Sequence, residues 1–198
     1  VRPAVHLNFK KLGYNVEDVE TIYNGSAQTI ADVAADDKGW FDGNAMTLTY
    51  PSGMTTVGDY QVKAELTQAV INEGLTFVGE PDTSIGESES VRYFKFTVKP
   101  KPLDATLSES DGTVTLTVDE NGLCGSDEMP NTAIQYTSTD GRGYNSTTAP
   151  QQKGDFKAEP KITDANSNYS LNCTPASVTF TIDSIKVSLP TLPPTGTP

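Results

Sequence analysis

Side chains that could perform chemistry are few in this chain. It contains one histidine, His6, and two cysteines, Cys124 and Cys173. A single histidine leaves little scope for a histidine-based metal site or a catalytic triad, because both need several partners of fixed type. The sequence also lacks the Gly-x-Ser-x-Gly, phosphate-loop and His-Glu-x-x-His patterns of common enzymes. We therefore expect no enzymatic activity, no cofactor and no metal.

Carboxylates are the most abundant ionisable groups. The chain has 26 acidic and 14 basic residues, a net charge of −12 and a pI of about 4.4. This balance argues against nucleic acid and against anionic lipid as partners, because both attract clustered Lys and Arg. Residues 32–37 and 119–120 are acidic runs without the spacing of a calcium loop, so we expect solvated acidic faces.

Two further features concern aromatic and apolar residues. Trp40 and Phe41 could form an exposed platform for a sugar ring, but packing in a core or an interface is the favoured interpretation. No apolar run approaches the ~20 residues that cross a bilayer, so we expect no membrane span in this chain.

The elements that must position these groups are predicted to be β-strands. Apolar and polar residues alternate with a period of two, and Gly-, Asn- and Asp-rich turns separate the alternating runs. Residues 64–73 could form a helical turn, and residues 16–22 are ambiguous. The pattern predicts an all-β chain built of β-sandwiches. The alternating runs are residues 46–50, 60–66, 94–98, 113–118 and 178–182.

The order of these elements indicates an internal duplication. Gly58-Asp59-Tyr60 and Gly154-Asp155-Phe156 each begin a strand, and each is followed by a closing strand, at 94–98 or 178–182. A turn-then-strand opening precedes each, at 24–30 and 111–115. The repeat distance of roughly 90 residues is the size of one immunoglobulin-like domain.

We therefore predict two tandem immunoglobulin-like β-sandwiches. They comprise residues 1–101 and 102–188, followed by a Pro/Thr-rich linker at 189–198. Residues 1–12 are interpreted as a strand of a preceding domain or one borrowed by the first sandwich. The two prolines of residues 99–102 predict a short, stiff connector. The expected core residues are Leu48, Tyr60, Val62, Phe94 and Phe96 in the first sandwich, and Val114, Leu116, Phe156, Phe180 and Ile182 in the second.

Three stretches of the first half carry a resemblance to a known family. Residues 23–30 (Tyr-Asn-Gly-Ser-Ala-Gln-Thr-Ile) are similar to an opening Tyr-x-Gly-x-x-Gln motif, residues 57–62 to an Ala-Gly-x-Tyr-x-Val strand, and residues 96–103 to a junction between repeats. These motifs are those of the tandem Ig-like repeats of large bacterial surface proteins called MBG or YDG repeats. The second half resembles them only in its Gly-Asp-Phe strand and its closing strand.

The resemblance implies an extracellular, non-catalytic module on a bacterial cell surface. Outside the cell, Cys124 and Cys173 would be oxidised, so we expect one disulfide between them, the alternative being two reduced thiols too far apart to bond. Leu192, Pro193, Pro194, Thr195 and Gly196 fit the Leu-Pro-x-Thr-Gly sorting motif of Gram-positive wall proteins, which would anchor the chain to the cell wall. A Pro/Thr linker that matches by chance is the other interpretation.

Three functions remain open at this point. The first is a structural stalk or spacer. The second is an adhesin domain that binds a host glycan or a matrix protein. The third is a pilin-like subunit, for which Lys99 or Lys101 would be the acceptor lysine. We expect a monomer whose other contacts are with neighbouring domains of the same chain.

Overall fold

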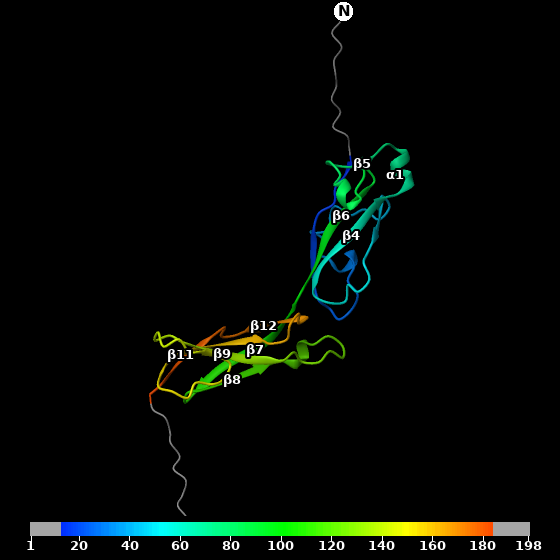
Figure 1. Ribbon diagram of the computed structural model, residues 1–198. Coiled ribbons are helices and arrows are strands. Elements are labelled where there is room, and N and C mark those ends of the chain that lie inside the picture. Colours follow the sequence, from blue (N-terminus) through cyan, green and yellow to red (C-terminus); the bar gives the residue numbers. More distant parts are fainter. Residues whose placement is uncertain (1–12, 184–198) are drawn as a thin grey trace, which may run out of the picture. The chain divides into compact units, whose positions relative to one another are not determined.

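A computed structural model describes residues 13–183 of the chain (Figure 1). His6, the expected strand at 1–12, the linker at 189–198 and the sorting-like motif lie outside the described residues. The fold is all-β, with several sheets, as the alternating sequence pattern predicts. None of the helices within residues 13–183 has the length and apolarity that crossing a bilayer requires.

The chain forms two compact units. Unit 1 comprises residues 13–101 together with two short segments, Cys124–Asp127 and Asn166–Tyr169. Unit 2 comprises Pro102–Leu123, Glu128–Ala165 and residues 170–183.

The secondary structure of residues 13–100 is mixed but dominated by strands. Its strands are β1 (Gly13–Tyr14), β2 (Val19–Ile22), β3 (Met46–Thr49), β4 (Gly58–Leu66), β5 (Thr76–Phe77) and β6 (Val91–Lys99). Its short helices are η1 (Ile30–Asp32), α1 (Gln68–Asn72) and η2 (Thr83–Ile85).

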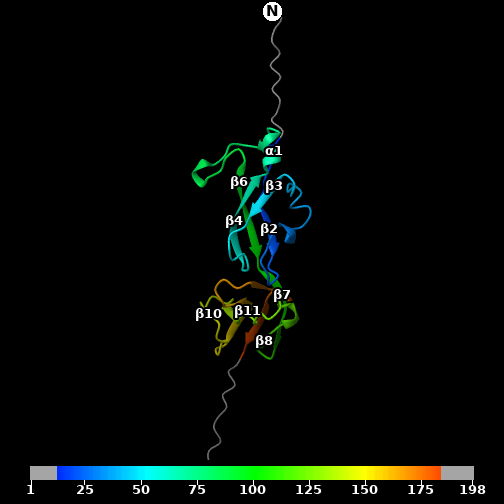
Figure 2. The same cartoon turned by 90° about the vertical axis from the view of Figure 1, so that its right-hand side faces the viewer.

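One four-stranded sheet organises unit 1, in the order β2-β6-β4-β3 (Figure 2). Neighbouring strands are antiparallel except for β2 and β6, which run parallel. A parallel pair cannot be joined by a tight hairpin, so the chain travels through β3, β4 and β5 between these two strands.

One face of this sheet is buried. Val62 of β4 and Phe94 and Phe96 of β6 are at most 3% exposed, as predicted from the alternation. Connecting segments cover them: Trp40 packs edge-on against Phe94 with ring centroids 5.1 Å apart. The predicted core residues Leu48 and Tyr60 are only partly buried. The opposite face of the same strands carries polar residues and is open to solvent.

The remaining strands are β7 (Lys101–Ser110), β8 (Thr113–Val118), β9 (Thr132–Ser138), β10 (Asn145–Ser146), β11 (Gly154–Ile162), β12 (Tyr169–Cys173) and β13 (Val178–Ile182), with η3 at Glu120–Gly122. They form a four-stranded sheet, β10-β9-β11-β13, and a three-stranded sheet, β12-β7-β8.

The core of unit 2 draws on both of these sheets. The predicted core residues Phe156 and Phe180 are buried there with Tyr136, and Val114 of the three-stranded sheet packs against them. Val114 and Ile182 are partly buried, as is Leu116. In β8 the three threonines are exposed and the alternate aliphatic residues are partly buried, as the sequence pattern predicts.

The duplicated Gly-Asp-aromatic pattern has equivalent roles in the two units. In unit 1, Asp59 lies opposite Thr97 and accepts a hydrogen bond of 2.7 Å from its hydroxyl. In unit 2, Asp155 lies opposite Thr181 and accepts the same bond, also at 2.7 Å. The repeated sequence pattern therefore marks equivalent positions in the two strand pairs, β4–β6 and β11–β13.

One predicted element is wrong. The expected strand within residues 24–30 is a loop that leads into η1. Thr29 caps this helix: its hydroxyl accepts the N–H of Ala31, while the Asp32 carboxylate accepts the N–H of Thr29 at 2.8 Å. The reciprocal cap satisfies backbone groups that a strand would have offered to a neighbour. Residues 64–73 end in the expected helical turn, α1, and residues 16–22 contain β2.

Candidate functional site

The two cysteines have separate surroundings and are both free thiols in the structure. Cys124 belongs to unit 1 and is buried, with the Lys101 ammonium 3.4 Å from its sulfur. Cys173 belongs to unit 2 and is partly buried at the end of β12, and burial raises the pKa of its thiol. The expected disulfide is therefore not formed in the structure.

Trp40 and Phe41 form part of the packing of unit 1. Their rings meet edge-on at 6.1 Å, and Trp40 also contacts Phe94 of β6. The Trp40 indole N–H is buried without a hydrogen-bond partner among the described residues. This agrees with the packing interpretation rather than with an exposed platform for a sugar.

The acidic runs serve partly as helix caps. Asp32 completes the capping box of η1 by accepting the N–H of Thr29, and Asp119 caps η3 by accepting the N–H of Asn121 at 2.9 Å. Within residues 13–183, no group of three or more His, Cys, Asp or Glu side chains is arranged to hold a metal ion.

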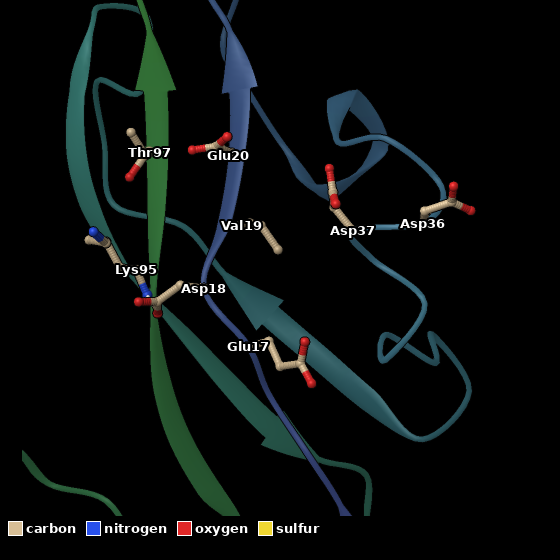
Figure 3. Close-up of a pocket in the computed structure, with 8 residues that line it drawn as sticks. All are labelled: Glu17, Asp18, Val19, Glu20, Asp36, Asp37, Lys95 and Thr97. Carbon is tan, nitrogen blue, oxygen red and sulfur yellow. The ribbon is translucent and has the colours of Figure 1, made fainter.

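An acidic pocket of about 350 Å³ lies along β2 (Figure 3). Asp18 and Lys95 form part of its wall: the Asp18 carboxylate accepts the backbone N–H of Lys95 at 2.7 Å. The other acidic residues of its lining come from β2, from the segment just before it and from the loop after η1. They are Glu17, Glu20, Asp36 and Asp37.

A second depression, which we call the β4–β6 groove, has a volume of about 330 Å³ and shares Asp18 and Lys95 with the acidic pocket. Its lining also includes Gln61 of β4, Tyr93 of β6 and Ile85 of η2. Gln61 lies opposite Lys95 in the strand register. The groove thus combines an aromatic ring and an aliphatic side chain with amide, ammonium and carboxylate groups.

A buried ion pair supports one side of this groove. Arg92 is 6% exposed, and its guanidinium donates to the carbonyls of Ser88, Val91 and Gly79. The Glu87 carboxylate lies 3.7 Å from the Arg92 Nε and accepts the N–H of Tyr93 at 2.9 Å.

The same carboxylate also accepts the N–H of Asp82 at 2.8 Å. Asp82 caps η2, the short helix that carries Ile85. These bonds hold the loop between β5 and β6 in one shape, so the position of Ile85 beside Tyr93 is built into the fold.

The opening motif of the resemblance lies in a hydrogen-bonded cluster of unit 1. The hydroxyls of Tyr23 and Tyr169 both donate to one oxygen of Asp127, at 2.7 and 2.6 Å. The Asp127 bond, with burial, raises the pKa of Tyr23 to about 12. Burial and the same carboxylate raise the pKa of Tyr169, and the two hydroxyls lower that of Asp127. The cluster holds the segments Cys124–Asp127 and Asn166–Tyr169 within unit 1.

Two other residues of this motif have clear structural roles. Gln28 is 1% exposed; its N–H donates to the Met54 carbonyl at 3.0 Å and its amide donates to the Ser26 carbonyl at 3.0 Å. Gly25 has a φ of 82°, and a Cβ there would lie 2.8 Å from the Cβ of Cys124. Gln28 and Gly25 of the motif therefore stabilise the conformation of a loop.

Sequence reasoning did not identify the β4–β6 groove or its support. Arg92 follows the pattern of a strand residue, and Glu87 lies in a loop with several carboxylates. The only available signal was the alternation of this strand, which places Arg92, two residues before Phe94, on the buried face.

The chain matches no protein-family model, and comparison with curated proteins gives no match. The resemblance to MBG or YDG repeats thus rests on the motifs quoted above and stays a prediction.

Proposed function

We propose that the chain is a non-catalytic, load-bearing spacer of an extracellular bacterial surface protein. The observation that carries this proposal is the parallel pairing of β2 and β6 in unit 1. These are the first and last strands of its four-stranded sheet in chain order, and they lie side by side.

Parallel pairing of the first and last strands determines how tension acts on the sheet. Tension along the chain pulls β2 towards its amino end and β6 towards its carboxyl end. Because the strands run in the same direction, they are pulled in opposite directions along their length. The hydrogen bonds between β2 and β6 are therefore loaded together in shear. In an antiparallel hairpin pulled at its open end, by contrast, the hydrogen bonds between its two strands break one at a time.

Bonds at both ends of β2 extend this shear contact. Before the strand, the Asp18 carboxylate accepts the N–H of Lys95 at 2.7 Å. After it, the N–H of Tyr23 donates to the Lys99 carbonyl at 2.9 Å, and Lys99 also forms an ion pair with Glu20. The loaded contact therefore runs from residue 18 to residue 23.

The finer architecture that we propose is two tandem immunoglobulin-like sandwiches in a monomeric chain. It is supported in unit 2 by two sheets that share a core, and in unit 1 by the strand pair β4–β6, which is equivalent to β11–β13. Tyr23 and Asp127 of unit 1 both have shifted pKa values, and they bind each other and hold backbone segments, which is a structural use. The sorting-like motif at Leu192 to Gly196 would supply the anchor.

Single-molecule force spectroscopy tests the proposal, with the full chain pulled from its two ends. Asp18→Ala removes the bond before β2, and Asp36→Ala is the matched control because it removes another carboxylate of the same pocket. We expect a lower unfolding force for unit 1 in Asp18→Ala and no change in Asp36→Ala. Equal forces for both variants would contradict the load-bearing role of this contact.

A further inference from the structure

The β4–β6 groove has the composition of a site for a small polyhydroxylated ligand. Gln61 supplies an amide donor and acceptor, and Lys95 supplies a donor. Tyr93 supplies an aromatic ring and a hydroxyl, and Ile85 a further apolar surface. A pyranose ring has one apolar C–H face and a rim of hydroxyls, so it needs this combination of apolar contact and mixed hydrogen-bonding groups. The volume of about 330 Å³ falls in the range of small-ligand sites.

The polar groups of the groove are available to a ligand. Among the described residues, the Gln61 amide, the Tyr93 hydroxyl and the Lys95 ammonium have no hydrogen-bond partner in the protein. One oxygen of each lining carboxylate is engaged: that of Asp18 by the Lys95 N–H, and that of Asp59 by the Thr97 hydroxyl. The second oxygen of each is left to accept from a ligand.

The groove is also preformed. Ile85 is 45% exposed although it is apolar, and the loop that presents it is fixed by the Arg92–Glu87 pair, whose side chains are 7% and 10% exposed. Burying two charges costs free energy unless they are paired and hydrogen-bonded, as these are. A rigid loop lowers the entropy lost on binding, because the site need not be ordered by its ligand.

Charge selects among the possible saccharides. The groove contains the carboxylates of Asp18 and Asp59 and the ammonium of Lys95, and the acidic pocket adjoins it. Because the chain has a net charge of −12 and the groove adjoins an acidic pocket, negatively charged ligands such as sialylated, sulfated or uronic-acid saccharides are disfavoured. We propose that the β4–β6 groove binds neutral glycans, one or two pyranose rings at a time. The site goes beyond the spacer function and does not depend on it.

The first test is a titration of the full chain, labelled with ¹⁵N, with lactose, maltose and cellobiose, alongside a screen on an array of neutral, acidic and cationic glycans. We expect at least one neutral glycan to bind with a dissociation constant of about 1 mM or below. Its amide shift changes should centre on Gln61, Tyr93, Lys95 and Ile85.

Variants then assign the binding to the groove. Gln61→Ala and Tyr93→Ala should each weaken binding by about tenfold, the usual effect of losing one good hydrogen bond or one stacking contact. Glu65→Ala is the matched control, because Glu65 lies on the same face of β4 as Gln61 but does not line the groove. Its affinity should equal that of the wild type.

Several results would overturn the proposal. They are the absence of binding to any neutral glycan up to about 10 mM, shift changes that centre elsewhere in the chain, and an unchanged affinity in Gln61→Ala. Binding restricted to cationic oligosaccharides would likewise reject it in favour of attraction by the acidic pocket. If Tyr93→Ala does not fold, the proposal is decided by the affinity of Gln61→Ala and by the amide shift changes of the wild type. Gln61 is exposed, so its replacement leaves the core intact.

Discussion

Replacing Arg92 by Met should weaken unit 1 far more than the loss of an ordinary surface charge. Arg92 is buried and lies with its guanidinium carbon 5.7 Å from the centre of the Phe77 ring. It donates to the carbonyls of Gly79 and Ser88 in the loop between β5 and β6 and to that of Val91 at the start of β6. Methionine fills similar space but donates no hydrogen bond. It would leave Glu87 as a buried carboxylate without its cation.

The size of the effect follows from these contacts. Removing one partner of a buried ion pair costs about 3–5 kcal/mol, because the other charge stays buried and uncompensated. By contrast, Lys63→Met removes an ion pair with Glu65 whose side chains are 32% and 48% exposed. Such surface pairs contribute about 0–1 kcal/mol, so Lys63→Met is the matched control in the same sheet.

Urea unfolding followed by tryptophan fluorescence is the assay. The chain has a single tryptophan, Trp40, which packs on Phe94 and therefore reports on unit 1. Arg92→Met should lower the free energy of unfolding of unit 1 by about 3–5 kcal/mol. The double variant Arg92→Met with Glu87→Gln should be more stable than Arg92→Met alone. It removes the unpaired negative charge of Glu87 and keeps an amide oxygen that can accept the same hydrogen bonds.

Two results would refute this reasoning. A loss for Arg92→Met no larger than that for Lys63→Met would show that the pair is not effectively buried. A double variant no more stable than Arg92→Met would show that the uncompensated charge of Glu87 is not the source of the loss.

Two other predictions concern pH and thiols. The raised pKa of Tyr23, about 12 against 10 in the unfolded chain, means that its contribution to stability is complete below pH 10 and is lost as the pH rises from 10 to 12. Wild-type stability in urea should therefore fall more steeply over that interval than the stability of Tyr23→Phe, and parallel curves would contradict the assignment. Alkylation in denaturant without a reductant should label both Cys124 and Cys173, since both thiols are free in the structure; an unlabelled chain that reacts only after reduction would instead establish the disulfide.

Strands whose side chains alternate were predictable from the sequence. In residues 113–118 Thr alternates with Val and Leu, and this alternation directly indicates which side chains face water. The paired Gly-Asp-aromatic motifs were recognisable for a similar reason, because Asp59 and Asp155 bond to the threonine directly opposite in the closing strand.

The rest depends on contacts between residues distant in the sequence. β2 has four residues, too few for a periodic signal, and its parallel partner β6 lies more than 70 residues further along the chain. Residues 24–30 were misassigned although Thr29 and Asp32 have the spacing of a capping box, a local signal of a helix start that could have been used. The β4–β6 groove was not foreseen, because the loop beside it is held by a buried Arg92, and arginine is a residue type that is mostly exposed.

The central claim, that unit 1 resists tension through shear between β2 and β6, is tested most directly by changing the direction of pulling. One set of molecules is pulled from its two ends, and the other from a handle at the exposed Thr55, just before β4, and the carboxyl end. In the second geometry the force acts on the start of β4 and on the end of β6. These two ends lie next to each other, with Asp59 opposite Thr97, because the strands are antiparallel. The hydrogen bonds of this pair therefore open one at a time. We predict a higher unfolding force for end-to-end pulling at the same loading rate, with unit 1 identified by its gain in contour length at about 3.6 Å per residue. An end-to-end force equal to or below that measured from Thr55 would contradict the load-bearing account.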